Sequence, residues 1–237
     1  MEKLWIKWSR AHITDKGGQY VASAVNTVWK QNLSRAPMEK KEREETNMGE
    51  YNPEEMKKAF IKILAAVDRP GITDLLAWLE TTDFYTAPAS TKYHGAYKGG
   101  LLEHSLNVYE RLLKLAAGYD LDSIAIVGLL HDLCKADFYK ESTRNQKDEQ
   151  GKWQQVPCYT FNDQFPAGHG EKSVMLIMRF IRLTDEETMA INWHMGGFDI
   201  RAHGYGLQEA WGKYPLAVMA HIADLEATWL DETGVKK

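Results

Sequence analysis

Six side chains of types that bind metals recur from residue 104 onward. They are His104, the adjacent pair His131-Asp132, His169, His194 and Asp224. Imidazole is the commonest side-chain ligand of transition metals, and a carboxylate can bridge two ions. Successive members lie roughly 25 to 37 residues apart, which is enough for one helix and one connection. The spacing therefore predicts a ligand from each of several helices, as in bundles that bind metals in their cores.

Each of these residues also has an ordinary structural interpretation. A single histidine in an apolar helix is more often a packed core residue, and Asp224 alone would suit a helix surface or cap. However, His131-Asp132 and Asp224 lie within apolar segments, 129–133 and 220–225, that contain no lysine or arginine. A buried charge needs a partner or a metal. The segments therefore favour a metal site over salt bridges.

The elements that must position these residues are mainly helices. Apolar residues recur at three- and four-residue steps, and Asn52-Pro53 and Thr184 to Glu187 are typical helix starts. The expected helices cover residues 53–67, 73–79, 101–117, 120–133, 171–183, 184–194 and 215–230. The fold class is thus all-α.

Other segments lack this periodicity. A small β-hairpin or ordered loop is expected around 140–165, with long loops at 81–100 and 195–213. The second of these loops is expected to include a helical turn near Leu207 to Trp211. The charge-rich residues 1–50 are expected to form a helical extension or linker. Residues 51–237 would then form the main domain.

Composition excludes several classes of protein. The chain has 237 residues, 44% of them apolar, which suits one large domain. A net charge of −4 gives no strong reason to expect binding to duplex nucleic acid. Two cysteines without a CxxC pair argue against disulfides and thiolate zinc sites. With no signal peptide or apolar run long enough to span a membrane, we expect a cytoplasmic protein. The oligomeric state stays open.

The residues around the first ligands resemble those of a known family. Gly99 to His104, Gly128 to Lys135 and Asp224 together resemble the HD superfamily of metal-dependent phosphohydrolases. The resemblance extends from about residue 54 to 232. His169 and His194 resemble the two extra histidines of its binuclear subgroup, which includes cyclic-dinucleotide phosphodiesterases and 3′–5′ exoribonuclease-type domains. The Gly-Tyr-Pro signature of the cyclic-di-GMP branch is absent.

The resemblance implies an all-α HD-domain helical bundle with two divalent transition-metal ions, Mn or Fe. His104, His131, Asp132 and Asp224 would bind one ion, and His169 and His194 the other, with Asp132 between them. Cys134 replaces the glycine commonly found before the lysine of the motif, and little effect beyond packing is expected from it.

The implied reaction is hydrolysis of a phosphodiester in a nucleotide or oligonucleotide, with a metal-activated bridging hydroxide as nucleophile. Asp132 and Lys135 are the candidate catalytic residues. Lys135 would neutralise the phosphate, although it could equally be a lysine that favours the helix end. The candidate substrate contacts are His94, Tyr97, Lys98 and Lys172. Glu103 and His221 are candidates for orienting the ligands.

Three other functions fit the same residues. A mononuclear site would suit a nucleoside monophosphate phosphatase, and His169 and His194 distinguish it from a diesterase. A similar helical bundle serves di-iron oxygenases. A nucleotide- or partner-binding module with an inactive site is the non-enzymatic alternative.

Overall fold

The computed structural model describes residues 52–232, so the expectation for residues 1–50 lies outside the described residues. The elements are α2 (Pro53–Ala65), α3 (Ile72–Leu79), α4 (Gly100–Leu115), α5 (Leu121–Leu130), the 3₁₀ turn η1 (Leu133–Lys135), β1 (Tyr139–Lys147), β2 (Trp153–Phe161), α6 (His169–Ile177), α7 (Asp185–Asn192), the 3₁₀ turns η2 (Gly196–Phe198) and η3 (Ile200–His203), α8 (Gly206–Lys213), α9 (Pro215–Glu226) and the π-helical turn η4 (Ala227–Glu232). The predicted all-α class is confirmed, with one small two-stranded sheet.

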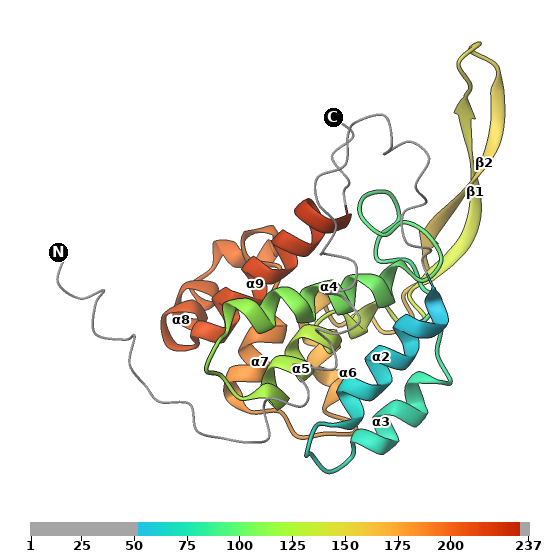
Figure 1. Cartoon of the computed structure of the whole chain (residues 1–237). Helices are drawn as coiled ribbons and strands as arrows, with labels where there is room; N and C mark the ends of the chain where they lie inside the picture. The colour runs from blue at the N-terminus through green and yellow to red at the C-terminus, as the bar shows by residue number, and fades with distance from the viewer. Residues whose placement is uncertain (1–51, 233–237) are drawn as a thin grey trace, which may run out of the picture. The chain divides into compact units, whose positions relative to one another are not determined.

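The core surrounds α5, which lies among the other helices in Figure 1. Every residue of α5 from Ile124 to Leu130 is buried, because its apolar residues cover all sides of the helix. The same core includes buried side chains from α2, α3, α4, α6, α7 and α9. The His-Asp pair, which directly follows α5, is therefore held at the end of the most buried helix.

Both predicted helix starts are confirmed. The Asn52 side chain accepts hydrogen bonds from the backbone of Glu54 and Glu55 at the start of α2. At the start of α7, Thr184 and Glu187 form a reciprocal capping box.

The predicted helix at 171–183 differs from the observed one. Helix α6 begins two residues earlier and ends earlier, so His169 is its first residue. The predicted loop at 195–213 also contains a full helix, α8.

Two glycines let the ligand-bearing helices approach closely. A Cβ at Gly128 in α5 would lie 2.6 Å from the Tyr109 Cα in α4, and a Cβ at Gly170 in α6 would lie 2.2 Å from the Asn192 backbone oxygen in α7. No real Cβ tolerates such contacts, so a larger residue would push the helices apart. The first approach brings His131 toward His104, and the second brings His169 toward His194.

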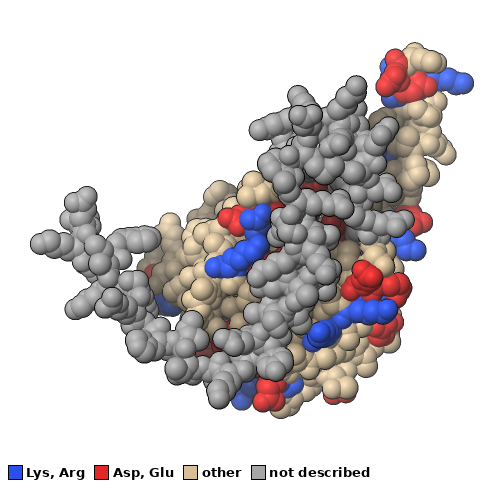
Figure 2. Space-filling model, in the orientation of Figure 1, with Lys and Arg blue, Asp and Glu red and all other residues tan. Residues whose placement is uncertain are grey.

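The predicted hairpin is confirmed as β1 and β2, which pair antiparallel from Tyr139 opposite Phe161 to Lys147 opposite Trp153. In Figure 1 it projects away from the helices. Figure 2 shows acidic and basic side chains interspersed on the described surface in that view, including at the hairpin tip, where Lys147 to Lys152 lie. Among the described helices, none has the length and hydropathy needed to cross a bilayer.

Candidate metal centre

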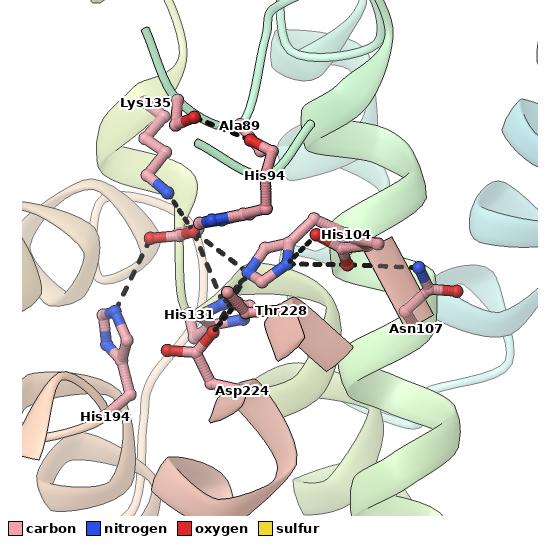
Figure 3. Close-up of polar contacts among 12 residues, drawn as sticks. Ala89, His94, His104, Asn107, His131, Lys135, His194, Asp224 and Thr228 are labelled. Atoms are coloured by element: carbon pink, nitrogen blue, oxygen red, sulfur yellow. Dashed lines mark hydrogen bonds and ion pairs between the residues drawn. The ribbon is translucent and has the colours of Figure 1, made fainter. Parts of the chain in front are cut away.

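The structure brings the six predicted ligand candidates together. We call His104, His131, Asp132, His169, His194 and Asp224 the Asp132 cluster; Figure 3 shows most of its side chains pointing toward one another. They come from α4, the end of α5, the start of α6, the end of α7 and α9. The side chains of His104, His131, Asp132 and His194 are 1–3% exposed, whereas that of His169 is 32% exposed. The cluster is therefore buried and open to solvent mainly at His169.

The two carboxylate oxygens of Asp132 face different pairs of histidines. Oδ2 lies 3.4 Å from His104 Nε2 and 3.5 Å from His131 Nε2. Oδ1 lies 2.9 Å from His169 Nε2 and 3.5 Å from His194 Nε2. Asp224 Oδ1 joins the first pair, 3.3 Å from His104 Nε2. This arrangement suits a carboxylate that bridges two cations, one beside each pair.

The opposite ring nitrogen of each histidine has its own partner. His131 Nδ1 donates to the Gly128 backbone oxygen at 3.0 Å, and His194 Nδ1 donates to the Ile191 backbone oxygen at 2.7 Å. His104 Nδ1 donates to Glu232 at 3.0 Å. A carbonyl or carboxylate can only accept, so in the neutral form these three rings present a bare lone pair at Nε2. That is the form in which imidazole binds a metal.

In the neutral form, several of these lone pairs face another acceptor instead of a hydrogen-bond donor. His104 Nε2 and His131 Nε2 lie only 3.2 Å apart. His194 Nε2 and Asp132 Oδ1 are buried and lack a well-aligned hydrogen-bond partner among the described residues. Bare acceptors that converge in a buried site call for a cation. The residues present therefore fit divalent metal ions.

The charge balance leads to the same conclusion. Three carboxylates contact the imidazoles of this site, those of buried Asp132 and of the partly buried Asp224 and Glu232. Among the described residues, the lysine paired with them is Lys135, whose Nζ donates to Asp132 Oδ2 at 2.6 Å. Three negative charges and one positive charge leave two negative charges for histidine protons or metal ions to neutralise.

Protonation follows from these contacts. Burial lowers the pKa of the His131 and His169 imidazoles. Burial also opposes charge on His104, but Asp132, Asp224 and Glu232 outweigh it and raise the pKa of His104 well above its usual value. For Asp132, burial is outweighed by Lys135 and the histidines, which hold its pKa well below the usual range. In the metal-free site, a proton on His104 thus supplies part of the missing positive charge.

Glu232 is a site residue that the sequence analysis missed. It lies in η4 and contacts His104 Nδ1, while Asn107 Nδ2 donates to it at 3.1 Å. Glu103, which was expected to orient a ligand, instead accepts a hydrogen bond from the Tyr97 hydroxyl. Glu232 lies beyond residue 230, where the last predicted helix ends, and it meets His104 across 128 residues, so no local pattern in the sequence indicated it.

His221 contacts the backbone of a ligand candidate. Its Nδ1 lies 2.7 Å from the His194 backbone oxygen, and its ring packs against Trp211 with centroids 5.4 Å apart. The structure therefore brings His221 to His194, where it can orient the backbone.

Two of the predicted substrate contacts, Lys172 and Lys98, lie in separate cavities. A cavity of about 210 Å³ opens beside His169. Its lining residues are Cys134, Phe138, Asp163, Pro166, Gly168, His169 and Lys172. Lys172 Nζ donates to Asp163 at 2.6 Å in this cavity. Lys98 lines a separate cavity of about 270 Å³ that no member of the Asp132 cluster lines.

His94 packs directly on the cluster. Its ring centroid is 4.9 Å from that of His104, and its Nε2 is buried without a hydrogen-bond partner among the described residues. Burial lowers the pKa of His94 to about 4, so the ring is neutral near pH 7. His94 therefore has an unused polar atom beside the cluster (Figure 3).

Cys134, from which only an effect on packing was expected, also contacts the cluster. Its Sγ lies 3.2 Å from His169 Nδ1. Burial raises the pKa of the thiol to about 12, so the sulfur carries its proton near neutral pH.

Comparison with known proteins agrees with this geometry. The HD domain family matches residues 101–224, which include all six members of the cluster. A curated protein of Methanocaldococcus jannaschii, dihydroneopterin 2′,3′-cyclic phosphate phosphodiesterase, is 35% identical over 92 residues. The match covers 35% of this chain and 35% of that protein. No solved structure matches.

Proposed function

The chain belongs to the HD domain family, and we propose that it hydrolyses a phosphodiester bond in a nucleotide or short oligonucleotide at a two-metal Asp132 cluster. The observation that supports this most strongly is that the two carboxylate oxygens of Asp132 have different neighbours. Each carboxylate oxygen faces its own pair of imidazoles, within 3.5 Å in every case. A single-ion site would need only one of these pairs.

The proposed ligands of each ion follow from which imidazoles face each Asp132 oxygen. One ion would be held by His104, His131, Asp132 Oδ2 and Asp224, and the other by His169, His194 and Asp132 Oδ1. Mixed imidazole and carboxylate ligands suit Mn or Fe. Adjacent divalent ions supply a water of lowered pKa and neutralise the charge of phosphoryl oxygens.

The protein's own residues prepare the site for this chemistry. Lys135 holds Asp132 Oδ2 at 2.6 Å, so its ammonium group fixes the bridging carboxylate. Its predicted contact with the substrate phosphate stays a prediction. Glu232 and the backbone oxygens of Gly128 and Ile191 accept from Nδ1–H on three rings, so that Nε2 of each ring faces the site. The imidazoles are thereby preorganised before an ion binds.

The substrate would approach through the cavity beside His169, because this is the most exposed ligand candidate. Lys172 lines the cavity and can contact a phosphate oxygen in exchange for Asp163. His94, with its unused Nε2, can donate or accept a hydrogen bond on the opposite side, beside His104. A cavity of about 210 Å³ suits one small group of the substrate.

The relative from Methanocaldococcus jannaschii supports the diester substrate, since its described activity opens a 2′,3′-cyclic phosphate. Because it matches over 35% of its length, the likeness supports the reaction class more than the substrate.

The test is a substrate panel with the full chain loaded with Mn²⁺ or Fe²⁺. The panel contains 2′,3′-cyclic mononucleotides, cyclic dinucleotides, short single-stranded RNAs and nucleoside monophosphates. We expect cleavage of at least one diester, with the activity lost on chelation and restored by the metal.

Two outcomes would contradict the proposal. Release of inorganic phosphate from monophosphates alone would assign the site to a phosphomonoesterase. Oxygen consumption by the iron-loaded protein with a cyclitol or phosphonate, without diester cleavage, would assign it to an oxygenase.

A further inference from the structure

The four histidines of the Asp132 cluster differ in what holds Nδ1. Two are held by backbone oxygens and one by a carboxylate, all of which only accept hydrogen bonds. The fourth, His169, has the Cys134 thiol as its Nδ1 partner, at 3.2 Å. A thiol both donates and accepts, although weakly. His169 is therefore held by a partner of a different chemical kind.

Cys134 joins two elements that carry ligands. It lies in η1, two residues after Asp132, and its backbone N–H donates to Ser173 Oγ at 3.0 Å. Ser173 lies one helical turn after His169 in α6, so both point from the same face of that helix. Through the two contacts, Cys134 fixes the start of α6 against the segment that contains Asp132.

The distances show that the sulfur contacts the ring mainly at Nδ1. Sγ is 3.2 Å from His169 Nδ1 but 4.0 Å from Nε2. The Nε2 atom is the one that faces Asp132 Oδ1, at 2.9 Å. The sulfur lies nearer to Nδ1 than to the nitrogen that faces the bridging carboxylate, and it is also within 4.8 Å of an Asp132 carboxylate oxygen.

A ligand is indicated at the Nε2 end of that ring. There, His194 Nε2 and Asp132 Oδ1 are buried and lack a well-aligned partner among the described residues. The His194 side chain is 1% exposed, and its ring centroid lies 5.0 Å from that of His169. The space between these atoms and His169 Nε2 is where the second ion of the proposed function would lie.

We propose that Cys134 is a positioning residue that orients His169 for the second metal ion, the ion shared with His194. This inference rests on the proposed two-metal function. With the ion bound, His169 Nδ1–H donates to the sulfur and Nε2 keeps its lone pair for the metal. Without the ion, the thiol can donate to Nδ1 while Nε2 carries the hydrogen toward Asp132. The backbone oxygens at His131 and His194 permit only the first arrangement.

Two consequences follow. The second ion is the one that Cys134 controls, and the first ion, at His104 and His131, does not depend on it. Loss of a hydrogen-bond partner of a metal-binding histidine typically weakens metal affinity about 10- to 100-fold. Loss of the Cys134 side chain should therefore weaken the affinity for the second ion and leave the affinity for the first unchanged.

The experiment compares the metal-free full-length wild type with Cys134→Ala, Cys134→Ser and the control Cys158→Ala, whose cysteine lies in β2. Each protein is titrated with Mn²⁺, and bound ions per chain are counted at equilibrium. In Cys134→Ala we expect unchanged affinity for the first ion and about 10- to 100-fold weaker affinity for the second. Cys134→Ser, which keeps a donor and acceptor, should lie between it and the wild type. Cys158→Ala should match the wild type.

Several results would overturn the inference. Equal second-ion affinity in wild type and Cys134→Ala would remove the positioning role and leave the two-metal proposal intact. A wild type that binds one ion only would overturn both. Replacement of Mn²⁺ by Co²⁺ gives an independent check, because an intense near-ultraviolet sulfur-to-cobalt band would make Cys134 a direct ligand and contradict the positioning role.

Discussion

Two buried acidic residues in this molecule have opposite surroundings. Glu187 in α7 is fully buried, and its oxygens accept hydrogen bonds from Arg69, Ser123 and the Thr184 backbone at 2.7–2.8 Å. Asp132 is 2% exposed, and its Oδ1 lacks a well-aligned partner among the described residues while two imidazoles face it. The chain satisfies every acceptor of the first site, whereas the second leaves converging acceptors that a bound cation could satisfy.

The comparison shows how burial should be interpreted here. A buried carboxylate needs partners wherever it lies. Where the chain supplies every proton, as at Glu187, the group is explained by folding alone. Where buried acceptors converge on one another, as at Asp132, folding leaves a cost that a bound ion can offset. If this comparison is right, substitutions at Asp132 should affect metal binding and activity, whereas those at Glu187 should affect stability alone.

The largest effect is expected for Asp132→Asn. The amide cannot bridge two cations, so the proposed diesterase activity should fall by about a thousand-fold or more. Mn²⁺ at 100 times its Kd should stabilise the wild type by about 2.7 kcal/mol and leave the variant unaffected. The measurements are turnover and urea unfolding with and without Mn²⁺, with exposed Asp74→Asn as control. Full activity in Asp132→Asn would refute the two-metal proposal.

A smaller effect, on stability alone, is expected for Glu187→Ala. The change leaves the Arg69 guanidinium without its main partner, and that side chain is only 17% exposed. Removing one member of a buried ion pair costs about 3 kcal/mol. Urea unfolding should show this loss both with and without Mn²⁺, and the stabilisation by Mn²⁺ should equal that of the wild type. If that stabilisation disappeared, the two sites would not be independent.

The sequence predicted local features of both sites better than distant ones. The capping box of Thr184 and Glu187 was predictable because its partners lie three residues apart. The Arg69 and Ser123 contacts of Glu187 join residues 118 and 64 positions apart, and no local pattern indicates them. Glu232 was missed for the same reason, since it meets His104 across 128 residues.

The ligand candidates were an exception to this limit. His104, His131, Asp132, His169, His194 and Asp224 are far apart in sequence, yet they were predicted together. Charged residues within apolar helices indicated His131-Asp132 and Asp224, and the spacing with the resemblance to the HD superfamily added the others. The close packing that gathers them depends on Gly128 and Gly170, whose importance becomes visible only when the helices are in place. Residue types thus indicated the chemistry, and the fold decided which atoms face one another.

The smallest effect concerns the pH dependence of Glu187. Burial acts to raise the pKa of its carboxyl, but Arg69, Thr184 and Ser123 hold that pKa below the usual 4.5. Above about pH 5 the carboxylate should contribute its full stability, and the contribution should decline as the pH falls through the folded pKa, because the unfolded chain binds the proton first. The excess unfolding free energy of wild type over Glu187→Gln should therefore shrink with acid.

Exposed Asp185→Asn, in the same helical turn, controls for general charge effects and should show no such convergence. A wild-type excess that stays constant down to pH 3 would mean that the Glu187 charge adds nothing beyond its hydrogen-bond geometry. The contrast with Asp132 would then rest on unpaired lone pairs alone, because the charge of Glu187 would play no part in completing the first site.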